Sequence, residues 1–231
     1  MTVRIEKQGR VWTVIHSRPE ARNAMDPESA EALLDAFQRF DADADAAAAV
    51  LWGEGGAFCA GFDLKYASTL KGGELDKLER GPMGPTRLEL DKPVIAAVAG
   101  PAVAGGFELA LWCDVRVMEA SAYFGVYCRR WGVPLVGGGT VRLPRIGACE
   151  HVVPDGTARE FAEAMAREIT RFPQGCLRAD RRSVHLQQGL PLREAMRAEW
   201  RNGAPVLAAE AVERAKRFAS GKGRHGDFGN I

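Results

Sequence analysis

The sequence predicts an α/β fold with a helical C-terminal region, and three observations carry this prediction. Short apolar runs typical of strands alternate with helical patterns before residue 160. Glycine follows these runs directly, as at Gly53 and Gly100. From Glu160 onward the pattern is helical, with breaks predicted at 172–173, 189–191 and 203–205. Strands mixed with helices, followed by helices alone, indicate an α/β core and a helical C-terminal part.

The N-terminal elements follow from strand formers and a capping signal. Residues 3–15 predict a β-hairpin, because valine and isoleucine dominate and Gly9 supplies the turn. After a loop over residues 17–24, Asp26 is expected to cap a helix whose first residue is Pro27.

The central elements are continuous apolar runs that end at glycine. Residues 48–52 and 94–98 predict strands covered on both faces, since neither run alternates with polar residues. Gly105 is expected to open a helix over 107–112, and residues 115–117 predict a further strand.

Composition excludes several function classes. The chain has 231 residues, 46% of them hydrophobic and 26% charged, which is enough apolar material for a sizeable core in one or two domains. A net charge of +1 gives no overall field that would recruit nucleic acid or an anionic membrane. No apolar run reaches the ~20 residues of a membrane helix. The five cysteines form no CxxC pair and the four histidines lack metal-ligand spacing, so we expect reduced thiols, no metal site and a cytoplasmic location.

Two glycine-rich segments, 57–64 and 100–109, follow predicted strands and point to chemistry. The first turn of a helix has N–H groups without hydrogen-bond partners in the helix, and it carries a partial positive charge. Two such N–H groups that converge on one point could hold a thioester oxygen as it becomes negative. Either segment alone is weak evidence, because glycine after a strand most often marks an ordinary turn.

The order and flanks of these segments resemble the enoyl-CoA hydratase/isomerase (crotonase) family. Residues 18–25 resemble its adenine-pocket loop, and 57–64 resemble its FxAGxDL motif. Residues 92–109 are similar to its KPVIAAVxGxAxGGGxEL signature, while 123–125 and 136–143 look like the next two landmarks. The resemblance covers most of residues 1–147 and resumes at His151.

The resemblance implies a crotonase-like spiral of stacked β-β-α turns with a C-terminal helical region. Residues 1–147 would form the acyl-CoA-binding core, and 148–231 would serve trimerisation in a homotrimer or dimer of trimers. It implies no cofactor other than the coenzyme A of the substrate. By motif position, Phe62 and Gly105 would supply the two oxyanion N–H groups. The residues implied along the coenzyme A path are Arg22, Ala24, Ala60, Asp63 and Leu64.

Glu108 falls where hydratases of this family carry a catalytic glutamate, three residues after Gly105. The second glutamate of these hydratases would stand at Cys128, and the aspartate that some relatives carry would stand at Gly137. A thiol stays mostly protonated near neutral pH and does not orient water as a carboxylate does. Glu108 is therefore the one carboxylate that matches the motifs.

A second departure from the family lies near residues 148–149. The flanks match the family, but a helix-turn-helix of ~20 residues, about 30 Å of continuous helix, has no counterpart between them. Either the chain lacks this element, or the sequence joins two ordered segments across a stretch that it leaves out. The clean match of the flanks favours the second interpretation.

Three functions remain open at the level of the sequence. The first is an enoyl-CoA hydratase-like enzyme, a lyase with an oxyanion hole and Glu108 as its single acid/base. The second is an enoyl-CoA isomerase, which needs only one carboxylate to move a proton between two carbons. The third is an acyl-CoA-binding protein without turnover.

Overall fold

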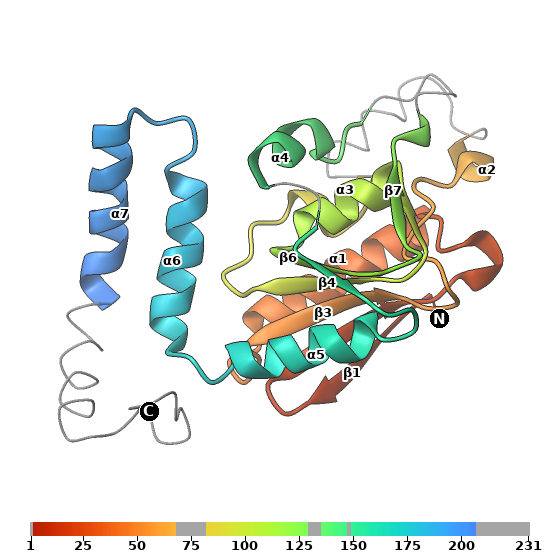
Figure 1. The fold of residues 1–231 in the computed structure, drawn as a ribbon, viewed down its shortest axis with the longest axis horizontal. Helices are drawn as coiled ribbons and strands as arrows, with labels where there is room; N and C mark the ends of the chain where they lie inside the picture. Colours follow the sequence, from red (N-terminus) through yellow and green to blue (C-terminus); the bar gives the residue numbers. More distant parts are fainter. Residues whose placement is uncertain (1, 68–81, 129–134, 147–148, 207–231) are drawn as a thin grey trace. The chain divides into compact units, whose positions relative to one another are not determined.

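The computed structural model describes residues 2–67, 82–128, 135–146 and 149–206 (Figure 1). The chain divides into two compact units, Met1–Arg167 and Glu168–Ile231. The boundary between the units lies after Arg167, whereas the expected boundary was residue 147. The reason is that residues 149–167 contact the N-terminal strands of the first unit. Arg159 pairs with Glu6, and the Thr13 hydroxyl donates to Glu163 at 2.9 Å.

The first unit is built on a mainly parallel sheet. Its strands have the order β1-β2-β3-β4-β6-β8; only β1 and β2 are antiparallel, and the other pairs are parallel. The six strands are β1 (Val3–Gln8), β2 (Val11–His16), β3 (Ala48–Gly53), β4 (Val94–Val98), β6 (Val115–Glu119) and β8 (His151–Val153). A second, two-stranded parallel sheet joins β5 (Pro101–Val103) to β7 (Tyr123–Gly125).

Helices cover both faces of the larger sheet, with α1 and α3 on one face and α5 on the other (Figure 1). The helices of this unit are α1 (Pro27–Ala42), α2 (Leu64–Ala67), α3 (Gly105–Trp112), α4 (Gly139–Ile146) and α5 (Ala158–Ile169), with 3-10 turns η1 (Pro19–Ala21) and η3 (Pro85–Arg87). The second unit contains α6 (Gln174–Leu186) and α7 (Leu192–Val206). Among the described residues, no helix is long and apolar enough to cross a membrane.

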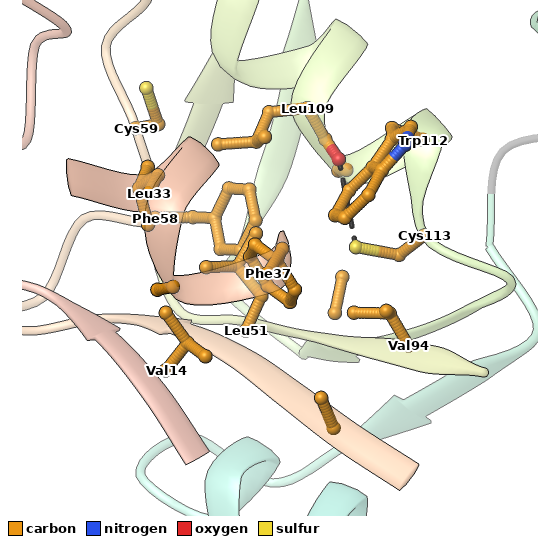
Figure 2. Packing of buried hydrophobic residues seen from close by; sticks show 14 of the residues in the cluster. Val14, Leu33, Phe37, Leu51, Phe58, Cys59, Val94, Leu109, Trp112 and Cys113 are labelled. Atoms are coloured by element: carbon orange, nitrogen blue, oxygen red, sulfur yellow. Dashed lines mark hydrogen bonds between the residues drawn. The ribbon is translucent and has the colours of Figure 1, made fainter. Parts of the chain in front are cut away.

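The core lies between α1, α3 and the central strands (Figure 2). Phe37 of α1 meets Trp112 of α3 edge to face, with ring centroids 4.9 Å apart. Leu51 of β3, Val94 of β4 and Leu109 of α3 are also buried in this cluster. Each such side chain contributes about 1.5–3 kcal/mol by leaving water. This packing fixes where α3 begins, which matters for the site.

The predicted elements are largely confirmed. Residues 3–8 and 11–16 form the hairpin, and the Asp26 side chain caps α1 by accepting from the Ser29 N–H at 2.9 Å. The predicted break at 203–205 is wrong, because α7 continues to Val206. Packing against α6 outweighs the local signal there, since the Asn202 amide donates to the Ala179 carbonyl at 2.5 Å.

The connection from α4 to β8 is short. Only residues 147–150 join Ile146 to His151, and 147–148 lie outside the described part. Glu150 holds the end of this connection on β6. Its carboxylate accepts from the Arg116 backbone N–H at 2.7 Å and pairs with the buried Arg116 guanidinium.

Candidate active site

The two glycine-rich segments lie side by side, as predicted. Cys59 pairs with Ala102 in a parallel bridge, and the Val103 N–H donates to the Cys59 carbonyl at 3.0 Å. Gly106 packs directly on this bridge: a Cβ placed there would lie 2.1 Å from the Cys59 carbonyl oxygen. Only glycine therefore allows α3 to begin this close to the 59–62 segment.

The N–H groups of Phe62 and Gly105 belong to this contact. A Cβ placed on Gly61 would lie 3.2 Å from the Gly105 nitrogen, so the peptide preceding Phe62 lies beside the start of α3. Met25 fixes this peptide through bonds on both sides, donating to the Gly61 carbonyl at 2.7 Å and accepting from the Asp63 N–H at 2.8 Å. Within the described part of the chain, no hydrogen bond occupies the Phe62 or Gly105 N–H.

Ala104 holds the turn that opens α3 in a strained conformation. Its φ of 52° and ψ of −122° suit glycine, which the family signature has at this position, and cost an alanine about 1–3 kcal/mol. The Ala104 N–H donates to the Gly125 carbonyl at 2.7 Å, and its own carbonyl accepts from Phe107 and Glu108. These bonds maintain the strained turn and thereby set the direction of the Gly105 N–H.

Glu108 lies in the first turn of α3 with only 3% of its surface exposed. Its Oε1 accepts from the Gly137 N–H at 2.7 Å and from the Gly139 N–H at 2.9 Å. Its Oε2 makes no hydrogen bond to a described residue. A carboxylate with one oxygen fixed and the other available suits a group that gives and takes a proton at one position.

The glycines at 137–139 lack the side chains that would collide with Glu108 or with Arg142. This role was not predicted from the sequence. A Cβ on Gly137 would lie 3.0 Å from Glu108 Oε2, and one on Gly139 would lie 3.0 Å from Glu108 Cγ. Gly138 has a φ of +100°, and a Cβ there would collide with Arg142 at 2.2 Å. Three consecutive glycines before a helix were the signal that could have found this contact.

The predicted coenzyme A loop does come together with the first glycine segment. Arg22 adopts the left-handed conformation with a φ of 51°, and its carbonyl accepts from the Ala60 N–H at 3.0 Å. Arg18, which the sequence did not single out, donates to the Ala24 carbonyl at 2.5 Å and pairs with Asp63 at 3.3 Å. The structure thus brings Arg22, Ala24, Ala60 and Asp63 into one region.

Asp63 stabilises the backbone of this region. Besides the pair with Arg18, its Oδ1 accepts from the Lys65 N–H at 2.9 Å and the Tyr66 N–H at 3.4 Å, which caps α2. Leu64, the next residue, is 47% exposed and therefore accessible. Asp63 accordingly shapes the loop, and Leu64 presents an apolar side chain beside it.

Asn23 is another residue that sequence reasoning missed. It is fully buried, its Oδ1 accepts from the Arg18 N–H at 2.7 Å, and its amide donates to the Glu54 and Ala57 carbonyls at 2.8 and 2.6 Å. The first bond lies within the loop at 18–25, and the other two connect this loop to residues 54 and 57, which lead into the segment that carries Phe62.

The five cysteines form no disulfide bond. All five are free thiols, and burial raises the pKa of the Cys59 thiol to about 12. Cys128 is half-buried and stands just before residues 129–134, which lie outside the described part. Among the described residues, no cluster of histidine, cysteine and carboxylate side chains could hold a metal ion.

Comparison with curated proteins gives relatives that act on coenzyme A thioesters. An enoyl-CoA hydratase of Mycobacterium tuberculosis is 34% identical over 93% of this chain and 92% of its own length. A carnitinyl-CoA dehydratase of Proteus mirabilis is 37% identical over 62% of this chain and 56% of its own length. The first alignment runs over 247 positions, whereas 93% of 231 residues is about 215, so about 32 positions have no counterpart in this chain.

Solved structures agree with these relatives. An enoyl-CoA hydratase from M. tuberculosis H37Rv superposes with a TM-score of 0.87, at 31% identity over 95% of this chain and 96% of that chain. One from Mycobacterium marinum gives the same TM-score at 30% identity and the same coverage. The predicted crotonase fold is thereby confirmed. The sequence model described as Enoyl-CoA hydratase/isomerase matches residues 6–167. The chain therefore belongs to the enoyl-CoA hydratase/isomerase family.

Proposed function

We propose that this protein is an enoyl-CoA hydratase-like enzyme that uses a single glutamate. In this proposal the Phe62 and Gly105 N–H groups hold the thioester oxygen, and Glu108 moves the proton. The observation that carries it is the Glu108 carboxylate itself, buried one helical turn beyond Gly105, with Oε1 held by two backbone amides and Oε2 uncommitted among the described residues. A protein that only binds acyl-CoA would not require a buried carboxylate with one oxygen held and the other uncommitted.

Hydration of a 2-enoyl thioester would use each of these groups. Glu108 Oε2 accepts a proton from water as the water oxygen bonds to C3, and the C2=C3 electrons move onto the thioester oxygen. The Phe62 and Gly105 N–H groups stabilise that enolate, and each oxyanion donor contributes ~3–4 kcal/mol in comparable enzymes. Protonated Glu108 then delivers its proton to C2, which completes the addition of one water and restores the carboxylate.

The coenzyme A portion is proposed to lie along Arg22, Ala24, Ala60 and Leu64, with Asp63 holding the loop. Arg22 supports this because its side chain makes no hydrogen bond or ion pair with a described residue, so it is available to a phosphate. The assignment of 148–231 to trimerisation in a trimer or dimer of trimers remains a proposal from the family resemblance. The cytoplasmic location remains a proposal from the cysteine composition.

A second candidate, an enoyl-CoA isomerase, is favoured by the two positions without a carboxylate. Cys128 offers a thiol, and Gly137 uses its N–H on Glu108 at a place where a Cβ would lie 3.0 Å from Oε2. With one carboxylate, Glu108 would take a proton from C2 of a 3-enoyl thioester and return it to C4. A protein that only binds acyl-CoA is the third candidate, and affinity without turnover would identify it.

The decisive experiment compares the wild type with Glu108→Gln on crotonyl-CoA, following the ultraviolet absorbance of the conjugated thioester. With the wild type, we expect the absorbance to fall as the double bond is hydrated. General acid–base groups typically raise the rate 10²–10⁴-fold, so kcat of the variant should be lower by at least ~100-fold. Glu119→Gln, at the end of β6, is the matched control and should turn over normally. Absence of turnover on crotonyl-CoA, with conversion of a 3-enoyl-CoA, would replace hydratase by isomerase.

A further inference from the structure

Arg142 bridges two segments next to Glu108 without belonging to the proposed substrate path. It lies in the first turn of α4. Its Nη1 donates to the Gly137 carbonyl at 2.9 Å, and its Nη2 donates to the Thr86 carbonyl of η3 at 2.8 Å. One planar guanidinium therefore ties the loop that opens α4 to a second, separate part of the chain.

The same glycine that Arg142 holds also holds the acid/base. Gly137 accepts from Arg142 through its carbonyl and donates through its N–H to Glu108 Oε1 at 2.7 Å. The guanidinium lies against Gly138, whose φ of +100° and missing side chain make room for it. Burial lowers the pKa of Arg142, and the nearby Glu108 acts against that shift.

We propose that Arg142 is a positioning residue that holds Glu108 in its productive orientation through Gly137. This inference deepens the proposed function and rests on it. Without the guanidinium, the Gly137 carbonyl loses its hydrogen bond and the backbone at Gly137 is held less firmly. The Gly137 N–H then no longer points at Glu108 Oε1 in a fixed direction. Because a displacement of about 1 Å at a reacting group costs ~100-fold, kcat is expected to fall 10- to 100-fold. KM should change less than about threefold, since Arg142 contacts none of the residues proposed for coenzyme A.

A double-mutant cycle tests the proposal. Arg142→Met should lower kcat 10- to 100-fold in the wild type, but add less than about twofold to Glu108→Gln, because a positioning residue has no effect once the group it positions is absent. Arg142→Lys should recover only part of the loss, since an ammonium has no planar fork to reach both carbonyls. Full additivity of the two losses, or a rise in KM with kcat unchanged, would overturn the proposal.

Arg39→Met is the matched control. Arg39 is an exposed arginine of α1 that pairs with Asp35 at 3.3 Å. It should leave kcat within about twofold of the wild type. Equal losses in the two arginine variants would show a general effect of removing an arginine, and would refute a specific role for Arg142.

Hydrogen exchange of the Gly137 amide separates this inference from the proposed function. In 15N-glycine-labelled protein this amide should exchange slowly in the wild type and in Arg39→Met, but quickly in Glu108→Ala and Arg142→Met. That pattern in an inactive protein would refute the proposed function and keep Arg142 as the residue that positions Glu108. Slow exchange in a folded Arg142→Met variant would refute the positioning role, whatever the activity.

Discussion

Gly106 is the position where one added methyl group should move apart the two N–H groups proposed as oxyanion donors. Gly106→Ala places a Cβ 2.1 Å from the Cys59 carbonyl oxygen and 2.7 Å from the Cys59 carbonyl carbon. Both neighbours are backbone atoms of the segment that leads to Phe62, so no side chain can rotate out of the way. Either α3 or residues 59–62 must move.

The size of that movement follows from the contact distances. Real Cβ atoms essentially never approach such a neighbour closer than 3.0 Å, so the gap must widen by about 0.9 Å. Overpacking of this kind costs ~1–3 kcal/mol, which in a chain of this length lowers Tm by roughly 2–12 °C. A displacement of about 1 Å between the Phe62 and Gly105 N–H groups should lower kcat/KM by ~100-fold.

Gly203→Ala provides the matched control for this variant. Gly203 is also a helical glycine, but a Cβ there would meet nothing within 4 Å. It should keep full activity and gain ~0.5–1 kcal/mol from the better helix former. Thermal unfolding and steady-state kinetics of both variants decide the matter. If Gly106→Ala matches Gly203→Ala in Tm and in kcat/KM, the close contact between the two glycine segments is not what aligns the donors.

Three further predictions concern stability. Ala104→Gly should raise the free energy of unfolding by ~1 kcal/mol, because glycine relieves a strain of about 1–3 kcal/mol but is more flexible when unfolded; a lower urea midpoint would contradict this. Asn23→Ala should destabilise by at least ~2 kcal/mol, since it leaves the Glu54 and Ala57 carbonyls without their donor; a Tm within 2–4 °C of the wild type, the shift for about 1 kcal/mol, would refute it. Burial lowers the pKa of His16 to about 4 from 6.5, so the unfolded chain binds the proton more tightly and stability should fall by up to roughly 3 kcal/mol as pH drops from 6.5 to 4. Urea unfolding at both pH values should show this loss in the wild type and not in His16→Asn.

Much of the fold could be predicted because its signals are local. The apolar runs at 94–98 and 48–52 became β4 and β3, and Asp26 followed by Pro27 marked the start of α1. The pairing of β5 with β7 was not predicted, since strands of three residues carry no periodicity. Their partnership depends on a register between residues about 20 positions apart.

The candidate site also contains residues that a local sequence signal predicts and residues that it does not. Motif positions predict Glu108, Phe62 and Gly105 as site residues, because glycine and helix signals place their backbone locally. The groups that orient them come from far along the chain: Gly137 and Gly139 reach Glu108 across 29 and 31 residues. The three consecutive glycines at 137–139 hinted at a close contact, but the identity of their partner depends on packing between distant segments and could not be predicted from either segment alone.

The most direct test of the account follows proton exchange at C2 of a saturated thioester. Butyryl-CoA cannot be hydrated or isomerised, but an enzyme that holds its enolate on the Phe62 and Gly105 N–H groups will exchange a C2 hydrogen in D₂O. Because one carboxylate approaches C2 from one face, the wild type should incorporate a single deuterium, measured by mass spectrometry. Glu108→Gln should incorporate none above the buffer rate. No incorporation by the wild type, or equal incorporation by both proteins, would contradict the claim that Glu108 and the two N–H groups form an enolate site.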